Sequence, residues 1–185
     1  MSNKCIYSSL PDSDIERRRN LSFNFSYPNF DVPKRLSEFA KGKKYFIHTY
    51  GCQANYRDQE IMAGLLEKAG VSQAFSENSA DLIILNTCAV RENAEQKVFG
   101  KIGDLKNYKK VNSDVIICVC GCMVQQRHII EFITDKFKHV DLIFGTHNVT
   151  SLLDMLNDVI CKRIRLVDVK SIPGDIVENL PSVRQ

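Results

Sequence analysis

The sequence predicts a doubly wound α/β fold, in which a mostly parallel sheet carries helices on both faces. Three observations favour this class. From Lys43 onward, short apolar and β-branched runs alternate with longer stretches of helical period. The middle runs are almost wholly apolar, as is typical of strands covered on both sides. Strands separated by helices are joined by right-handed crossovers and run parallel, so we expect a flavodoxin-like three-layer sandwich.

The expected elements follow one another in strand–helix order. Strands are predicted at residues 44–49, 71–75, 82–86, 115–120, 140–144 and 164–169. Helices are predicted at residues 58–69, 92–109, 125–138 and 149–160. Gly70 suits the C-terminal cap of the first of these helices.

The two ends of the chain lack such a pattern. Residues 1–42 are expected to form an irregular N-terminal extension, with a helical turn or two around residues 34–41. Residues 43–170 form the predicted domain. Residues 171–185 contain Pro173-Gly174 and Pro181 and are expected to form a linker.

The composition is that of a globular chain, with 44% hydrophobic and 25% charged residues. No apolar run approaches the roughly 20 residues that span a bilayer, and the N-terminus lacks the apolar core of a secretory signal. Membrane, collagenous and coiled-coil classes are therefore excluded. Residues 1–44 hold nine Lys and Arg against five Asp and Glu, whereas residues 45–185 hold sixteen against seventeen. The folded part is therefore not expected to be the main electrostatic clamp for RNA.

Three of the seven cysteines follow predicted strands directly. Cys52 follows the first strand, Cys88 the strand at residues 82–86 and Cys122 the strand at residues 115–120. The carboxyl ends of parallel strands meet at the edge of the sheet where ligands bind, so the three thiols can converge. Because a chain without a secretory signal keeps its thiols reduced, metal ligands are favoured over disulfides.

Two of these cysteines share a local pattern, with glycine before the cysteine and an amide side chain three residues after it. The amides are Asn55 and Gln125. The helix that follows each turn offers N–H groups, which favour a thiolate or an anionic cluster. Cys118 and Cys120 lie within an apolar strand and are expected to pack as small hydrophobic residues.

The spacing leaves two ligands open. An iron–sulfur cluster on three cysteines would leave one iron without a protein ligand. Alternatively, His147 follows the strand at residues 140–144 and would complete a Cys3His site for structural zinc in an α/β interaction domain. His48 belongs to the first strand and is expected to be packed or hydrogen-bonded.

These motifs resemble the N-terminal domain of the tRNA methylthiotransferases. The segments that carry the resemblance are YGCQAN at 50–55, LNTCAVRENA at 85–94 and GCMVQ at 121–125. The segments typical of the MiaB branch are KVFG at 97–100, FGTHN at 144–148 and GDIVENLP at 174–181.

The resemblance implies that Cys52, Cys88 and Cys122 hold an auxiliary [4Fe–4S] cluster that carries or donates sulfur. It also implies a radical-SAM domain with a second [4Fe–4S] cluster and S-adenosylmethionine, an RNA-binding TRAM domain and a reductant protein. The whole enzyme would place a methylthio group on C2 of an N6-isopentenyladenosine beside the anticodon of tRNA, in the cytoplasm and without a membrane partner.

Four side chains are candidates for hydrogen bonds to such a cluster: Asn55, Asn86, Arg91 and Gln125; His147 is also expected near it. Turn and helix-cap chemistry explains the same residues equally well. No C-x3-C-x2-C motif occurs in the chain. We therefore expect no catalytic residue and no turnover in this segment by itself.

Overall fold

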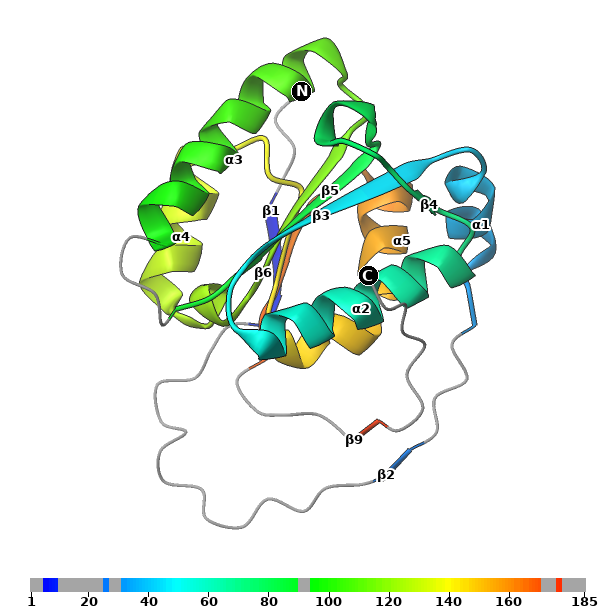
Figure 1. Ribbon diagram of the computed structural model, residues 1–185, viewed down its shortest axis with the longest axis horizontal. Helices are drawn as coiled ribbons and strands as arrows, with labels where there is room; N and C mark the ends of the chain where they lie inside the picture. The colour runs from blue at the N-terminus through cyan, green and yellow to red at the C-terminus, as the bar shows by residue number, and fades with distance from the viewer. Residues whose placement is uncertain (1–4, 10–24, 27–30, 90–93, 171–175, 178–185) are drawn as a thin grey trace.

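A seven-stranded parallel sheet forms the centre of the molecule (Figure 1). The computed structural model describes residues 5–9, 25–26, 31–89, 94–170 and 176–177. The strand order is β1-β8-β7-β6-β5-β3-β4, which confirms the doubly wound class. The strands are β1 (Cys5–Ser9), β3 (Lys44–Tyr50), β4 (Ser72–Gln73), β5 (Leu82–Thr87), β6 (Ile116–Gly121), β7 (Leu142–Phe144) and β8 (Arg165–Asp168).

Helices cover both faces of this sheet (Figure 1). One face carries α1 (Lys34–Ala40), α2 (Gln53–Lys68) and α5 (Leu152–Lys162). The other carries α3 (Ala94–Val111) and α4 (Arg127–Lys136). Short 3-10 helices connect the layers at η2 (Glu77–Ser79), η3 (Cys122–Gln125) and η4 (Thr146–Ser151). In the described part of the chain, no helix is both long enough and apolar enough to cross a bilayer.

The core has two layers, because alternate residues of each buried strand point to opposite faces. In β5, Ile84 packs with α2 and α5, whereas Ile83 and Leu85 pack with α3 and α4. In β6, Cys118 and Cys120 belong to the first layer and are 0% and 1% exposed. Their predicted role as small core residues is confirmed.

The ends of the chain differ from the expectation. The stretch 1–42 contains a strand, β1, which pairs in parallel with β8 and forms one edge of the sheet. Two-residue strands β2 (Phe25–Ser26) and β9 (Ile176–Val177) also pair, although no strand was expected in either end. Such short segments have no periodicity of their own, because a partner distant in sequence determines them. The helix predicted around residues 34–41 is confirmed as α1.

Candidate metal centre

The ends of β3, β5 and β6 lie at one level of the sheet. Tyr50 pairs with Thr87, and Thr87 pairs with Gly121. Since neighbouring strands are about 4.8 Å apart, these three ends span about 10 Å. Cys52 follows its strand by two residues, and Cys88 and Cys122 follow theirs by one. The sheet therefore brings the three cysteines to the same edge.

Cys88 follows β5, which lies between β3 and β6, the strands that precede the other two cysteines. Its side chain lies near enough to both to affect their titration, since it helps to lower the pKa of Cys52 and to raise the pKa of Cys122. Cys88 is 1% exposed, whereas Cys52 is exposed and Cys122 is half-buried. The middle thiol of the three is thus the most buried, and Cys52 is the most accessible.

Cys52 occupies the N-terminus of the 16-residue helix α2. Its Sγ accepts the backbone N–H of Asn55, and the Cys52 N–H donates to Asn55 Oδ1 at 3.1 Å. The N–H groups of Asn55 and Ala54, together with Cys88, lower the pKa of the Cys52 thiol. A helix N-terminus stabilises a thiolate in the same way. Cys52 is therefore the thiol best prepared to bind a metal.

Asn55 and Asn86 are both buried and hold the first two cysteine turns together. Asn55 Nδ2 donates to Asn86 Oδ1 at 3.0 Å and to the Thr87 carbonyl at 3.1 Å. Asn86 Nδ2 donates in return to the Asn55 carbonyl at 2.7 Å. Asn55 thus uses both amide hydrogens and its oxygen on protein partners. Asn55 therefore positions the two turns. Glycine at position 51 leaves space for the Asn55 side chain, because a Cβ on Gly51 would lie 2.1 Å from Asn55 Oδ1.

Gly121 brings the third cysteine turn against the second. Its φ of +103° lies in the left-handed region, and an added Cβ would lie 2.0 Å from the Thr87 carbonyl oxygen. Thr87 Oγ1 also donates to the Cys120 carbonyl. Burial, with a contribution from Cys88, raises the pKa of the Cys122 thiol, although the Ala89 N–H acts in the opposite direction.

Gln125 connects the Cys122 turn to η4. Its Nε2 donates to Thr146 Oγ1 at 3.3 Å, and its side chain fills the space where Gly145 has no Cβ. His147 lies in the same 3-10 helix, and burial lowers the pKa of its ring. Among the described residues, no interaction joins His147 to the three thiols. Arg91 lies outside the described residues.

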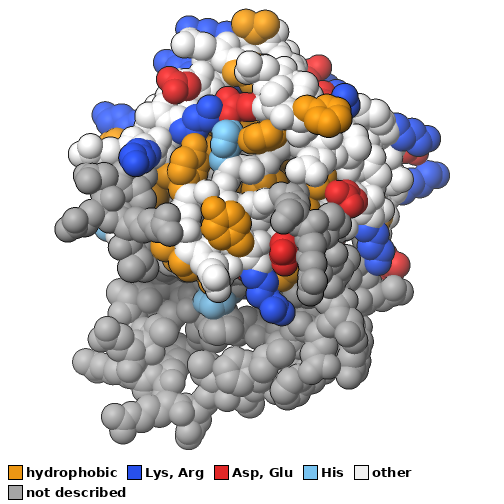
Figure 2. Space-filling model, viewed as in Figure 1, with side chains coloured by type: hydrophobic (Ala, Val, Ile, Leu, Met, Phe, Trp, Pro, Cys, Tyr) orange, Lys and Arg blue, Asp and Glu red, His pale blue; other side chains and the backbone are white. Residues whose placement is uncertain are grey.

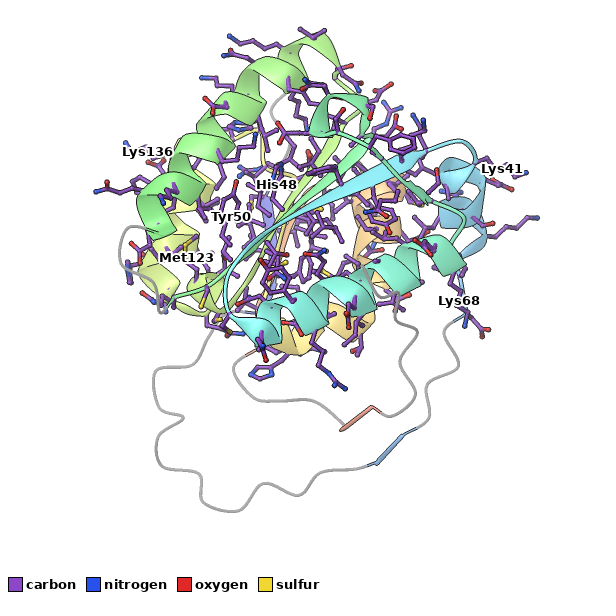
Figure 3. All side chains as sticks on the ribbon, viewed as in Figure 1. Lys41, His48, Tyr50, Lys68, Met123 and Lys136 are labelled. Atoms are coloured by element: carbon purple, nitrogen blue, oxygen red, sulfur yellow. The ribbon has the colours of Figure 1, made fainter. Side chains whose placement is uncertain are left out.

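His48 is hydrogen-bonded, as the sequence predicts. Its Nε2 contacts Glu77 Oε2, and Lys101 Nζ donates to Glu77 Oε1 at 2.9 Å. Figure 3 labels His48 and Tyr50 on β3, and Figure 2 shows acidic, basic and histidine side chains side by side on this face. These contacts explain His48 without a metal.

Asp58 is a residue that the sequence argument missed. It is partly buried on α2, where burial raises the pKa of its carboxyl to about 6, although Arg57 acts in the opposite direction. Its charge also contributes to the raised pKa of Cys120, after burial and Cys118. The signal in the sequence was helical spacing, because Asp58 follows Asn55 by three residues and lies on the same helix face.

The donor set suits one of the two ligands, zinc and an iron–sulfur cluster, better than the other. Across residues 31–89 and 94–170 and the shorter described segments, no three His, Cys, Asp or Glu side chains are grouped for one metal ion. Structural zinc requires four donors around one ion. An iron–sulfur cluster takes one thiolate at each of several iron atoms, so three soft thiols that follow adjacent strand ends fit it.

Known proteins resemble this chain over most of its length. It is 47% identical over 157 residues to a tRNA-2-methylthio-N(6)-dimethylallyladenosine synthase from Bacillus cytotoxicus and 48% identical to that from Bacillus mycoides. Each match covers 85% of this chain and 31% of the relative. The corresponding protein of Oceanobacillus iheyensis is 46% identical over 176 residues, which cover 95% of this chain and 34% of the relative.

The chain thus spans about a third of the length of these relatives. The resemblance to the tRNA methylthiotransferases, which the motifs predict, is confirmed by these matches. A family profile also matches residues 44–145, which begin at β3 and end after β7. The chain belongs to the family described as uncharacterized protein family UPF0004.

Proposed function

We propose that this chain is the auxiliary-cluster domain of a tRNA methylthiotransferase, with Cys52, Cys88 and Cys122 as ligands of a [4Fe–4S] cluster. The observation that carries the proposal is the position of the three thiols after three adjacent strand ends, which pair Tyr50 with Thr87 and Thr87 with Gly121. The similarity to tRNA-2-methylthio-N(6)-dimethylallyladenosine synthases supports the tRNA reaction.

The residues of this chain have distinct tasks in the proposal. The three thiolates anchor the cluster, and the N-terminus of α2 favours the ionised form of Cys52. Asn55 and Gln125 fix the turns that carry Cys52 and Cys122. When bound, the cluster would supply sulfur and an iron without a protein ligand.

The rest of the reaction is assigned to other parts of a longer enzyme. A radical-SAM domain with its own [4Fe–4S] cluster would cleave S-adenosylmethionine, with electrons from a reductant protein. A TRAM domain would bind the tRNA. The target would be C2 of an N6-isopentenyladenosine beside the anticodon, which places the enzyme in the cytoplasm. The segment alone would then be inactive.

The alternative is a structural zinc domain. It is favoured by the position of His147 in η4, directly after β7, since β7 neighbours β6. His147 and the three cysteines would then supply a Cys3His set.

Metal content distinguishes the two. The chain is reconstituted without oxygen, and iron, sulfide and zinc are measured with an absorption spectrum. The proposal expects about four iron and four sulfide per chain, lost in Cys52→Ala, Cys88→Ala and Cys122→Ala. Cys161→Ala is the matched control, because Cys161 lies at the end of α5 and bonds Asn157. Stoichiometric zinc that iron and sulfide do not displace, and that His147→Ala loses, would contradict the proposal.

A further inference from the structure

Five lysines and a histidine surround a hollow of about 370 Å³ on the α3/α4 side of the molecule. We call it the lysine hollow. Its lining residues are Lys106, Lys109, Lys110, Lys136, Lys138 and His139. They come from the ends of α3 and α4 and from the turn before β7, so the fold gathers them from separate segments. Figure 3 labels Lys136 on this side.

The hollow remains positive after its internal ion pairs are considered. Lys109 pairs with Asp141, and Asp135 lies 3.7 Å from Lys136 and 3.6 Å from Lys138. Within the described residues, Lys106 and Lys110 form no ion pair. His139 donates from Nε2 to the Ile102 carbonyl at 2.7 Å. Burial lowers the pKa of His139, and the charges of Lys109 and Lys106 lower it further, as expected in a positive field.

The positive charge extends beyond the hollow. Residues 94–111 and 127–138, which form α3, α4 and the following turn, hold eight Lys and Arg against four Asp and Glu. Helices α1, α2 and α5 on the opposite face hold five against six. The balanced charge of residues 45–185 thus conceals a difference between the two faces. Basic residues spread over two helices fit an extended polyanion better than a compact acidic ligand.

The hollow is well separated from the cysteine edge. Helix α3 begins after the Cys88 turn and runs back along the sheet to Lys109. Lys109 is fifteen residues beyond Ala94, which corresponds to about 22 Å along the helix axis at about 1.5 Å per residue. A nucleic acid is long enough to occupy both places at once.

We propose that the lysine hollow binds the phosphate backbone of RNA, at a distance from the cysteine edge. The inference rests on the proposed function, which makes tRNA the substrate. Lysine ammonium groups neutralise phosphates as point charges and release counterions from the RNA, so binding depends on salt. The contact positions the RNA and reads no sequence.

Binding of a labelled RNA stem–loop to the 185-residue chain tests this proposal by fluorescence anisotropy. The variant combines Lys106→Ala, Lys110→Ala and Lys136→Ala. The control combines Lys34→Ala, Lys41→Ala and Lys68→Ala, which remove the same charge from exposed lysines of α1, its C-terminal end and α2. Figure 3 shows Lys41 and Lys68 far from Lys136.

Three lost phosphate contacts change the logarithmic salt slope by about 2.7. Between about 50 and about 200 mM salt, the affinity of the wild type should therefore fall about 40-fold more than that of the variant. Replacing the same three lysines with arginine should preserve wild-type binding, because the charge remains.

The outcomes separate this inference from the proposed function. Equal affinity and salt slope in the hollow variant and the control would overturn the inference, whatever the iron and sulfide content. Binding of polyglutamate as tightly as RNA would also overturn it, in favour of an acidic protein partner. If the cysteine variants keep their iron, the cluster assignment is contradicted. RNA binding by the lysine hollow is then judged separately, from the anisotropy measurement.

Discussion

Asn55→Ala should destabilise the fold by more than a typical substitution in a helix. The change removes three hydrogen bonds, to the Cys52 N–H, to Asn86 Oδ1 and to the Thr87 carbonyl. It leaves the Asn86 oxygen without this donor at a position with 0% exposure. A hydrogen bond contributes about 1 kcal/mol, and an unsatisfied buried group costs about 1–3 kcal/mol. We expect the free energy of unfolding to fall by about 3–4 kcal/mol.

Urea unfolding followed by circular dichroism measures this loss, and Asn55→Asp identifies its origin. Aspartate keeps an oxygen for the Cys52 N–H, but it replaces Nδ2 with an acceptor facing Asn86 Oδ1 and the Thr87 carbonyl. If the link between the turns dominates, Asn55→Asp should be at least as unstable as Asn55→Ala. If helix capping dominates, aspartate should be nearly neutral. An Asn55→Asp protein within about 0.5 kcal/mol of the wild type would refute the reasoning.

Three further outcomes follow from the same edge of the sheet. Gly121→Ala should lower the free energy of unfolding by about 3 kcal/mol or more, because its Cβ would meet a backbone carbonyl oxygen at 2.0 Å at positive φ. Gly103→Ala, with open space in α3, should instead be neutral or stabilising in the same urea assay. In the metal-free chain, iodoacetamide should alkylate Cys52 at lower pH than Cys122, because the pKa of Cys52 is lowered and that of Cys122 is raised. Mass spectrometry measures the order of alkylation, and the reverse order would contradict these directions. Burial raises the pKa of Asp58 to about 6 from an ordinary 3.8, so the wild type loses stability as the pH rises through this range. The stabilisation of Asp58→Asn relative to the wild type should therefore be about 1–2 kcal/mol larger at pH about 8 than at pH about 4, after allowance for solvent screening. Equal gains at both pH values would contradict the assignment.

The sequence was most informative where a strand is buried on both sides. The runs that became β5 and β6 are almost wholly apolar, so their type and location could be predicted. Helix α2 begins at Gln53, five residues before the predicted start. Its first turn has no apolar period and is specified by the hydrogen bonds between Cys52 and Asn55. In the sequence this cap appears only as a cysteine with an amide residue three positions later, and the spacing does not show which groups bond.

Long-range pairing limited the prediction of the site. The cysteines could be assigned to one edge, because parallel strands place their carboxyl ends together. The contact between Asn55 and Asn86 could not be predicted, because it joins residues 31 positions apart and depends on the register between strands. Strand β1 was missed for the same reason, because Cys5 pairs with Arg165 at the far end of the chain.

The candidate metal centre is built by contacts within the protein. Asn55 joins the turns of Cys52 and Cys88, and the close approach of Gly121 to Thr87 joins the second turn to the third. A site ordered in advance loses less conformational entropy when its ligand binds. Replacing one of the three cysteines should therefore reduce cluster content with little loss of stability. Replacing Asn55 or Gly121, which hold the turns together, should reduce both cluster content and stability. This contrast separates metal ligands from positioning residues, which the spacing of the sequence could not do.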